Sequence, residues 1–217
     1  MSIRVLLVED HQMVREGLRS LLEHQDGIEV VGEATDGRSA VCLVRQVSPA
    51  VVVMDVSMPG LNGVEATRQI MTEMPGVKVI GLSMHTDKRF IMEMLRAGAS
   101  GYLLKASAFD ELVRAISVVA TGQVYLSPRI AGLIVNTCIE AETEPEASPF
   151  LLLTPREREV LQLLAEGKTA KEIARLFRVA RKTVDAHRQH IMDKLRLHTL
   201  ADLIKYAIKE GLVSLDA

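Results

Sequence analysis

A single carboxylate, Asp55, stands at the end of an uninterrupted apolar run, Val51–Met54. A short run of this kind is typical of a central strand in a parallel sheet that is covered on both faces. Pro59-Gly60 and Asn62-Gly63 then break the backbone before a helical pattern begins. Asp55 is therefore expected at the C-terminal end of a buried strand, where open α/β sheets place their chemistry. On turn statistics alone, an Asp that merely ends a strand fits this stretch about equally well.

Polar residues also end the other strand-like runs, and a parallel arrangement brings these ends together. The residues at the strand ends are Glu9, Asp10, Asp55, Ser83 and Lys105. Three neighbouring carboxylates repel one another and favour a bound cation, and oxygen ligands alone favour Mg²⁺ over a transition metal. A carboxylate beside Mg²⁺, a lysine and a hydroxyl suits phosphoryl transfer with the carboxylate as nucleophile. Independent capping of four strands explains the set poorly, so a phosphoryl-transfer site is predicted.

The runs that carry these residues alternate with helical patterns. Strands are predicted at 3–8, 29–34, 51–55, 78–83 and 101–105, and each is followed by apolar residues at helical spacing. The fourth helix is expected at Asp87–Ala97, with Gly98 as its stop. This alternation predicts an α/β doubly wound, parallel five-stranded sheet.

Residues 1 to about 122 resemble the receiver domain of bacterial two-component response regulators. The matching segments are Val8-Glu9-Asp10-His11, Met54–Gly63, Leu82-Ser83 and Gly101–Lys105. The resemblance implies a flavodoxin-like sheet in which Asp55 accepts a phosphoryl group from a sensor histidine kinase. It also implies that Asp10 and Asp55 bind Mg²⁺, with Glu9 helping through water and the backbone carbonyl of Ser57 as a further ligand. It further implies that Lys105 binds the phosphoryl group and that Ser83 and Tyr102 form a conformational switch. Many receivers have proline after the lysine, whereas this chain has Ala106.

The 217-residue chain has room for two domains, and the charges of its two parts differ. Residues 1–149 contain 13 Lys+Arg and 19 Asp+Glu, a net charge of −6, whereas residues 150–217 contain 13 and 9, a net charge of +4. The basic C-terminal part is compatible with nucleic-acid binding. There is no run of 18 apolar residues and no signal-peptide pattern, which predicts a cytoplasmic protein with no membrane partner. Cys42 and Cys138 fit no metal-ligand spacing and are expected to be packed free thiols.

A linker is predicted between the two domains, at residues 123–149. Apolar residues at helical spacing within Val124–Ile139 indicate a short helix. The acidic stretch Glu140–Pro149 contains two prolines and little to bury, which is typical of a flexible tether.

The C-terminal part, residues 150–217, is predicted to be an all-α domain of four helices. Thr154-Pro155-Arg156-Glu157 and Thr169-Ala170-Lys171-Glu172 are capping boxes that open the first two helices. The third helix, Arg181–Leu195, follows the second after a three-residue turn, and the fourth starts at Thr199. Two helices joined by so short a turn indicate a helix-turn-helix.

The predicted third helix has an apolar and a polar face. Val184, Ile191 and Leu195 face the expected core, and at about 100° per residue the opposite face carries Lys182, Asp185, Ala186, Gln189 and Asp193. Lys, Asp and Gln can read base edges, and Arg181 and Arg188 flank this face where they can reach phosphates. Charge content alone favours an ordinary solvated face.

This part resembles the DNA-binding domain of LuxR/NarL (FixJ) type regulators. The matching segments are Leu153–Leu161, Lys171-Glu172-Ile173-Ala174, Lys182–Arg188 and Ile191–Leu195. The resemblance implies a regulator that binds a double-stranded DNA operator as a homodimer when phosphorylated. It implies DNA contacts by Thr169, Lys171, Arg181, Lys182, Thr183, Asp185, Ala186, Arg188, Gln189 and Lys194, and dimer contacts by Leu203, Ile204, Ala207 and Ile208. Ala180 stands where a serine usually caps the recognition helix, which costs roughly 1 kcal/mol of helix stability.

Two other classes of protein share parts of this pattern. An aspartate-nucleophile phosphohydrolase would need a second acid two residues after its nucleophile, where Ser57 stands, so the chain is not expected to be an enzyme. A DNA-binding protein could instead use the receiver-like part for dimerisation alone, without phosphorylation. The complete set of strand-end residues argues against this alternative, and equal DNA binding with and without a phosphoryl donor would support it.

Overall fold

The computed structural model describes residues 2–84, 86, 88–140, 149–210 and 212–213. The chain divides into two compact units, Met1–Glu144 and Pro145–Ala217. Asp87, the predicted start of the fourth helix, and residues 141–148 of the predicted acidic tether lie outside the described residues. Among the helices that the structure describes, none is long and apolar enough to cross a membrane.

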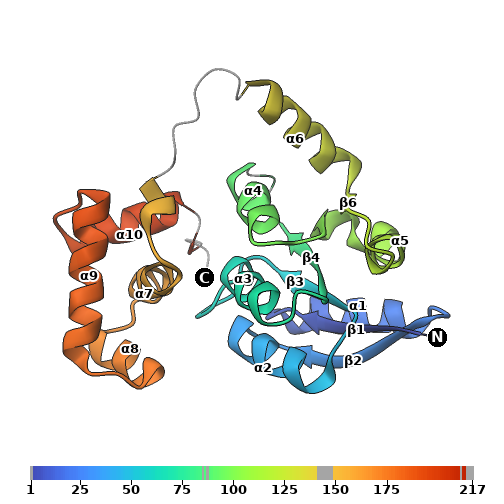
Figure 1. Cartoon of the computed structure of the whole chain (residues 1–217), viewed down its shortest axis with the longest axis horizontal. Coiled ribbons are helices and arrows are strands. Elements are labelled where there is room, and N and C mark those ends of the chain that lie inside the picture. Colours follow the sequence, from blue (N-terminus) through green and yellow to red (C-terminus); the bar gives the residue numbers. More distant parts are fainter. Residues whose placement is uncertain (1, 85, 87, 141–148, 211, 214–217) are drawn as a thin grey trace. The chain divides into compact units, whose positions relative to one another are not determined.

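The N-terminal unit contains a parallel six-stranded sheet with the strand order β2-β1-β3-β4-β5-β6 (Figure 1). The strands are β1 (Ile3–Val8), β2 (Ile28–Ala34), β3 (Val51–Asp55), β4 (Lys78–Ser83), β5 (Gly101–Leu104) and β6 (Tyr125–Leu126). β3 pairs with β1 on one side and with β4 on the other, and all of its residues are buried. The predicted doubly wound parallel sheet with a buried central strand is thereby confirmed.

Helices cover both faces of this sheet. They are α1 (Gln12–Glu23), α2 (Gly37–Val47), α3 (Gly63–Glu73), α4 (Lys88–Arg96) and α5 (Ala108–Ala120). On one face, α1 and α5 pack with residues such as Leu18 and Leu112 inward. On the other face, α2, α3 and α4 pack through residues such as Val44, Ile70 and Met94. Two separate apolar layers therefore hold the strand ends in a fixed arrangement.

The sheet has one strand more than the sequence predicts. The sequence predicts a helix within Val124–Ile139 and no strand there, but Tyr125 and Leu126 pair with Gly101 and Tyr102 of β5. A strand of two residues is too short to show an alternating pattern, so the sequence gives no signal for it. α6 (Pro128–Glu140) follows, and its Ile130 is completely buried in the core of the N-terminal unit. The first turns of the predicted linker thus pack on the receiver-like sheet.

Cys42 differs from its prediction, because it is exposed rather than packed. It lies on α2 between residues that take the inner face, with Val41 and Val44 buried. The side chain of Cys138 lies outside the described residues.

The C-terminal unit is a small helical domain. A 3₁₀ turn, η2 (Pro149–Leu152), leads into α7 (Pro155–Ala165), α8 (Ala170–Phe177), α9 (Arg181–Leu195) and α10 (Leu200–Lys209). Thr154 and Thr169 form the two predicted capping boxes. α7 packs against α8, α9 and α10. The predicted all-α domain with a helix-turn-helix formed by α8 and α9 is confirmed.

Candidate functional site

Asp55 is the last residue of β3 and is only 1% exposed. Directly after it, the Val56 amide donates to the Leu82 carbonyl (2.9 Å) and the Gly63 amide donates to the Val56 carbonyl (3.0 Å). The first turn of α3 therefore lies against the end of β3. A Cβ atom on Gly63 would overlap the carbonyl oxygen of Asp55, so only glycine allows this close approach.

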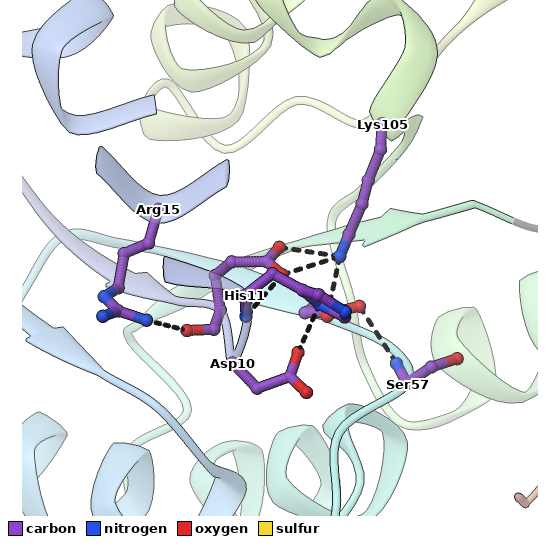
Figure 2. A network of polar contacts seen from close by, with 7 residues as sticks. Asp10, His11, Arg15, Ser57 and Lys105 are labelled. Carbon is purple, nitrogen blue, oxygen red and sulfur yellow. Dashed lines mark hydrogen bonds and ion pairs between the residues drawn. The ribbon is translucent and has the colours of Figure 1, made fainter. Parts of the chain in front are cut away.

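Lys105 reaches Asp55 from the end of β5. Its Nζ atom lies 2.8 Å from Oδ2 of Asp55 and 2.7 Å from Oε2 of Glu9 (Figure 2). The lysine side chain is 8% exposed, and Glu9 is buried. The Ser57 amide donates to the other carboxylate oxygen, Oδ1 of Asp55, at 3.1 Å. The ends of β1, β3 and β5 thus meet around one carboxylate.

Burial and neighbouring charges shift the pKa values of this pair in a consistent way. Burial, together with the nearby charge of Glu9, raises the pKa of Asp55 to about 7, although Lys105 and the Ser57 amide act in the opposite direction. Burial disfavours the charge of Lys105, but Asp55 and Glu9 outweigh this effect and raise its pKa above the ordinary value. The lysine is therefore a permanent cation, while the buried carboxylate still lacks stabilising positive charge.

The acidic residues at this edge form a cluster that suits a hard cation. Glu9, Asp10, His11 and Asp55 each offer one ligand atom, and these atoms lie within 4.8 Å of one another. Carboxylate oxygens are the donors that Mg²⁺ prefers, so the set fits the predicted ion. The side chain of Asp10 is 25% exposed and gives the cluster a solvent-facing side. The contact of Ser57 described above uses its amide, so its carbonyl as a ligand stays a prediction.

Two residues of the cluster have no role in the sequence-based prediction. Nδ1 of His11 lies 2.9 Å from Oδ1 of Asp10 and 3.2 Å from Oε1 of Glu9. Arg15 of α1 donates from Nη1 to the backbone carbonyl of Glu9 at 2.8 Å. The sequence gives no signal for this contact of Arg15, because its acceptor is a backbone carbonyl.

The two predicted switch residues lie on neighbouring strands. Ser83 ends β4 and is buried, one residue beyond Leu82, which pairs with Asp55. Tyr102 of β5 is completely buried and pairs with Gly81. A Cβ atom on Gly81 would lie 3.2 Å from Cδ2 of Tyr102 and 3.0 Å from Cγ of Met94, so glycine makes room for the ring beside α4.

In the C-terminal unit, α8 and α9 are joined by a tight turn. Arg178 ends α8 in the left-handed conformation, with φ of 55°, and the Val179 amide donates to the Ala174 carbonyl at 3.0 Å. Val184, Ile191 and Leu195 of α9 are buried, as predicted from the helical pattern. Ala180 occupies the N-cap position of α9 with no side-chain hydrogen bond, which confirms the predicted missing cap.

The outer face of α9 carries most of the predicted DNA-contacting residues. Lys182, Ala186 and Gln189 are exposed. Asp185 lies between two arginines, with Oδ2 at 3.5 Å from Nε of Arg181 and Oδ1 at 3.9 Å from Nη2 of Arg188. Among the other predicted residues of α8 and α9, Lys171 is exposed and Thr183 is half-buried. This face is therefore polar, open to solvent and flanked by cations.

Two predicted DNA-contacting residues have partners inside the domain. Lys194 donates to Oε2 of Glu157 at 2.6 Å and so joins α9 to α7. The hydroxyl of Thr169 is used in its capping box, where it donates to Oε2 of Glu172 at 2.7 Å. The resemblance alone places Lys194 with the DNA-contacting set, and spacing along one helix cannot reveal a partner on another helix.

The predicted dimer contacts on α10 divide into two groups. Leu203 and Ala207 are completely buried in the core of their own domain, so they offer no surface to a second copy. Ile204 and Ile208 are partly exposed. The adjacent apolar stripes of this helix look alike in the sequence, and packing against α7 decides which one is inside.

The fold and the site define a two-domain regulator, with an acidic site at the edge of a parallel sheet and a helix-turn-helix domain. The model of the response regulator receiver domain matches residues 5–117, and the model of the bacterial regulatory proteins of the luxR family matches residues 151–207. The chain belongs to the LuxR family of two-component response regulators, as both sequence resemblances predicted.

Relatives support this assignment along almost the whole chain. The chain is 41% identical over 210 residues to the response regulator UvrY of Escherichia coli, covering 97% of this chain and 95% of that protein. A crystal structure of a LuxR-family response regulator from Aurantimonas has 40% identity and a TM-score of 0.62, covering 64% of this chain and 99% of that chain. The response regulator RcsB in complex with DNA has 25% identity and a TM-score of 0.60, covering 99% of this chain and all 100% of RcsB.

Proposed function

We propose that this transcriptional response regulator is switched by phosphorylation of Asp55 by a sensor histidine kinase. The observation that carries the proposal is the 2.8 Å contact between Oδ2 of Asp55 and the buried ammonium of Lys105. In the transfer, a carboxylate oxygen of Asp55 forms a bond to phosphorus while the bond from phosphorus to the donor's imidazole nitrogen breaks. The ammonium of Lys105 would stabilise the negative charge first on the carboxylate and then on the phosphoryl oxygens.

Glu9, Asp10 and Asp55 would hold Mg²⁺, with the backbone carbonyl of Ser57 as a further ligand. Bound Mg²⁺ would neutralise charge on the phosphoryl oxygens. The close carboxylate oxygens support this assignment, since their mutual repulsion calls for a divalent cation. The family consists of regulators, and turnover of a separate substrate is not part of the proposed role.

Phosphorylation would change the packing near Ser83 and Tyr102. It replaces about one negative charge by about two and adds strong acceptor oxygens. The Ser83 hydroxyl would donate to one of these oxygens, and the ring of Tyr102, which packs beside Gly81 and Met94, would adjust to the change. The result is a shift between two packings of the surface formed by α4 and β5.

The C-terminal domain would place α9 in the major groove of an operator. Lys182, Asp185 and Gln189 would read base edges, and Arg181 and Arg188 would contact phosphates. The supporting set would be Thr169, Lys171, Thr183 and Ala186, whereas Lys194 would act mainly through Glu157. The DNA complex of RcsB, a relative along the full chain, supports this role for the output domain.

A homodimer would present two such helices to two half-sites. Two linked contacts are favoured because one small module gives limited affinity. Ile204 and Ile208 of α10 would contribute to the dimer contact, whereas the buried Leu203 and Ala207 would not. With a kinase as donor and an operator as target, the protein would work in the cytoplasm.

The decisive experiment measures binding to genomic DNA fragments at fixed salt, with and without Mg²⁺ and a small phosphoryl donor. The wild type is compared with Asp55→Asn and with Asp26→Asn, the same change at an exposed position. The donor should raise the affinity for a subset of fragments in the wild type and in Asp26→Asn only. Equally tight binding in all conditions would favour phosphorylation-independent binding, and sustained turnover of the donor would favour a phosphohydrolase.

A further inference from the structure

Arg15 on α1 holds the backbone at the point where the chain leaves β1. Its Nη1 atom donates to the carbonyl of Glu9 at 2.8 Å, and its Nε atom lies 3.3 Å from Oε2 of Glu33 on β2. The arginine side chain is 15% exposed. A planar guanidinium with two fixed acceptors has little rotational freedom, so this contact is well defined.

The carbonyl of Glu9 needs such a partner because the regular sheet ends there. The Glu9 amide still donates to the Ala34 carbonyl of β2 at 3.0 Å, and α1 begins three residues later at Gln12. The side-chain oxygens of Glu9 face Lys105 and the amide of His11. Contacts on the amide, the carbonyl and the side chain together fix the orientation of Glu9, and with it that of the adjoining Asp10.

The position of Arg15 is not explained by the stability of α1. A cation near the start of a helix interacts unfavourably with the helix dipole. Arg19, one turn later, binds the same Glu33 and also Glu23, but it does not contact Glu9. The ion pair with Glu33 therefore does not require an arginine at position 15, whereas the contact with the Glu9 carbonyl does.

We propose that Arg15 is a positioning residue for the cation site, and that it aligns the carboxylates of Glu9 and Asp10 by clamping the Glu9 carbonyl. The inference rests on the proposed function, since it assigns these carboxylates to Mg²⁺. It concerns geometry rather than charge. A nearby positive charge alone would weaken the binding of a cation, whereas correct placement of the ligands strengthens it.

Three variants of the full-length protein separate these two effects. Arg15→Gln removes both the positive charge and the planar guanidinium that contacts two acceptors. Arg15→Lys keeps the positive charge but has a single ammonium group as donor. Arg19→Gln serves as the matched control. The dissociation constant of Mg²⁺ is measured by calorimetric titration without phosphoryl donor. Exchange of the Asp10 and His11 amides is measured in metal-free buffer, and thermal unfolding follows the overall stability.

We expect Arg15→Gln to raise the dissociation constant for Mg²⁺ roughly tenfold, or about 1.4 kcal/mol. Arg15→Lys should recover part of this loss, and Arg19→Gln should stay within about twofold of the wild type. Exchange at Asp10 and His11 should be faster in Arg15→Gln only. If Arg15 only stabilised the fold, Arg15→Gln would lower the unfolding temperature and leave Mg²⁺ affinity unchanged.

Two results would overturn the inference. Equal or tighter Mg²⁺ binding by Arg15→Gln would mean that Arg15 acts through its charge or has no influence on the site. Unchanged exchange at Asp10 and His11 would mean that the clamp does not order this loop. Failure of the proposed function would look different, because the wild type would then bind Mg²⁺ but acquire no phosphoryl group at Asp55.

Discussion

The Nζ atom of Lys105 lies 2.8 Å from Oδ2 of Asp55, so the buried carboxylate has a cationic partner before any phosphoryl group arrives. The same ammonium lies 2.7 Å from Oε2 of Glu9. Lys105 therefore neutralises part of the charge that would otherwise attract a divalent cation. It stabilises the metal-free site and at the same time competes with Mg²⁺ for the same carboxylates.

Replacement of Lys105 by methionine should separate these two effects. The free energy of unfolding of the metal-free protein should fall by about 3 kcal/mol, because two buried carboxylates lose their partner. Mg²⁺ should bind roughly tenfold more tightly, since the competing charge is gone. Thermal unfolding and calorimetric titration measure the two quantities. Lys78→Met is the control, because Lys78 pairs with Val51 at the opposite end of β3 from Asp55. Unchanged Mg²⁺ affinity in Lys105→Met would contradict the competition between Lys105 and Mg²⁺.

The sequence predicts the elements of this site better than the contacts between them. The apolar run before Asp55 is enough to place a central strand, and the parallel order then gathers the strand ends. Arg15 could not be assigned, because its acceptor is a backbone carbonyl that leaves no trace in residue identity. The resemblance places Lys194 with the DNA-contacting residues, and the sequence does not reveal its partner Glu157, which is 37 positions away on another helix. Long-range partners of this kind depend on tertiary packing, which periodicity does not reveal.

The ion pair between Glu157 and Lys194 should make the stability of the C-terminal domain depend on pH. Burial disfavours the Glu157 charge, but Lys194 and the Thr154 amide and hydroxyl outweigh it and hold its pKa below the ordinary value. A carboxyl with a depressed pKa in the folded state stabilises the fold above its unfolded pKa and loses this effect as pH falls through the folded one. The stabilisation should therefore be complete at neutral pH and disappear in acid.

Glu157→Gln tests this dependence in the full-length protein. At pH 7 the variant should lose about 2 kcal/mol of domain stability, as expected for a hydrogen bond to a charged group. The difference from the wild type should shrink as the pH falls well below 4.5. Amide exchange in α7 and α9 measures it. Glu172→Gln is the control, since Glu172 forms the other capping box, with Thr169, but lacks an ion pair like that between Glu157 and Lys194. If the stability difference between Glu157→Gln and the wild type persisted in acid, the ion pair would not be its source.

Restoring the N-cap of α9 should stabilise the recognition helix. Ala180 has the extended N-cap conformation, with φ of −72° and ψ of 146°, but no side-chain acceptor. Ala180→Ser supplies a hydroxyl that can accept from an amide of the first turn, where the Thr183 amide now donates only to the Ala180 carbonyl at 3.0 Å, and should add about 1 kcal/mol to local stability. Slower amide exchange at Thr183 would show the gain. Ala186→Ser, the same change in the middle of the helix, should cost a few tenths of a kcal/mol; equal effects of the two substitutions would contradict capping.

The carboxylate of Asp185 restrains two cations on the DNA-facing side of α9. It lies 3.5 Å from Nε of Arg181 and 3.9 Å from Nη2 of Arg188, and it is itself a repulsive charge toward phosphates. Asp185→Asn should release both arginines and raise the affinity for random DNA several-fold, with a steeper dependence on salt. If Asp185 reads a base as proposed, the change should also reduce discrimination at that base pair, because a carboxylate accepts from the amino group of cytosine.

A salt series with operator and random DNA measures both effects of Asp185→Asn. Asp26→Asn is the matched control, because it is the same change at an exposed position of the N-terminal unit. The ratio of the affinity for operator DNA to the affinity for random DNA should fall roughly tenfold in Asp185→Asn. A loss of this size lies within the roughly 1–3 kcal/mol that one good base contact contributes to discrimination. A rise in both affinities with an unchanged ratio would show that Asp185 controls the approach to phosphate and does not contact a base. Specificity would then depend on Lys182 and Gln189, the other exposed base-reading candidates on this face.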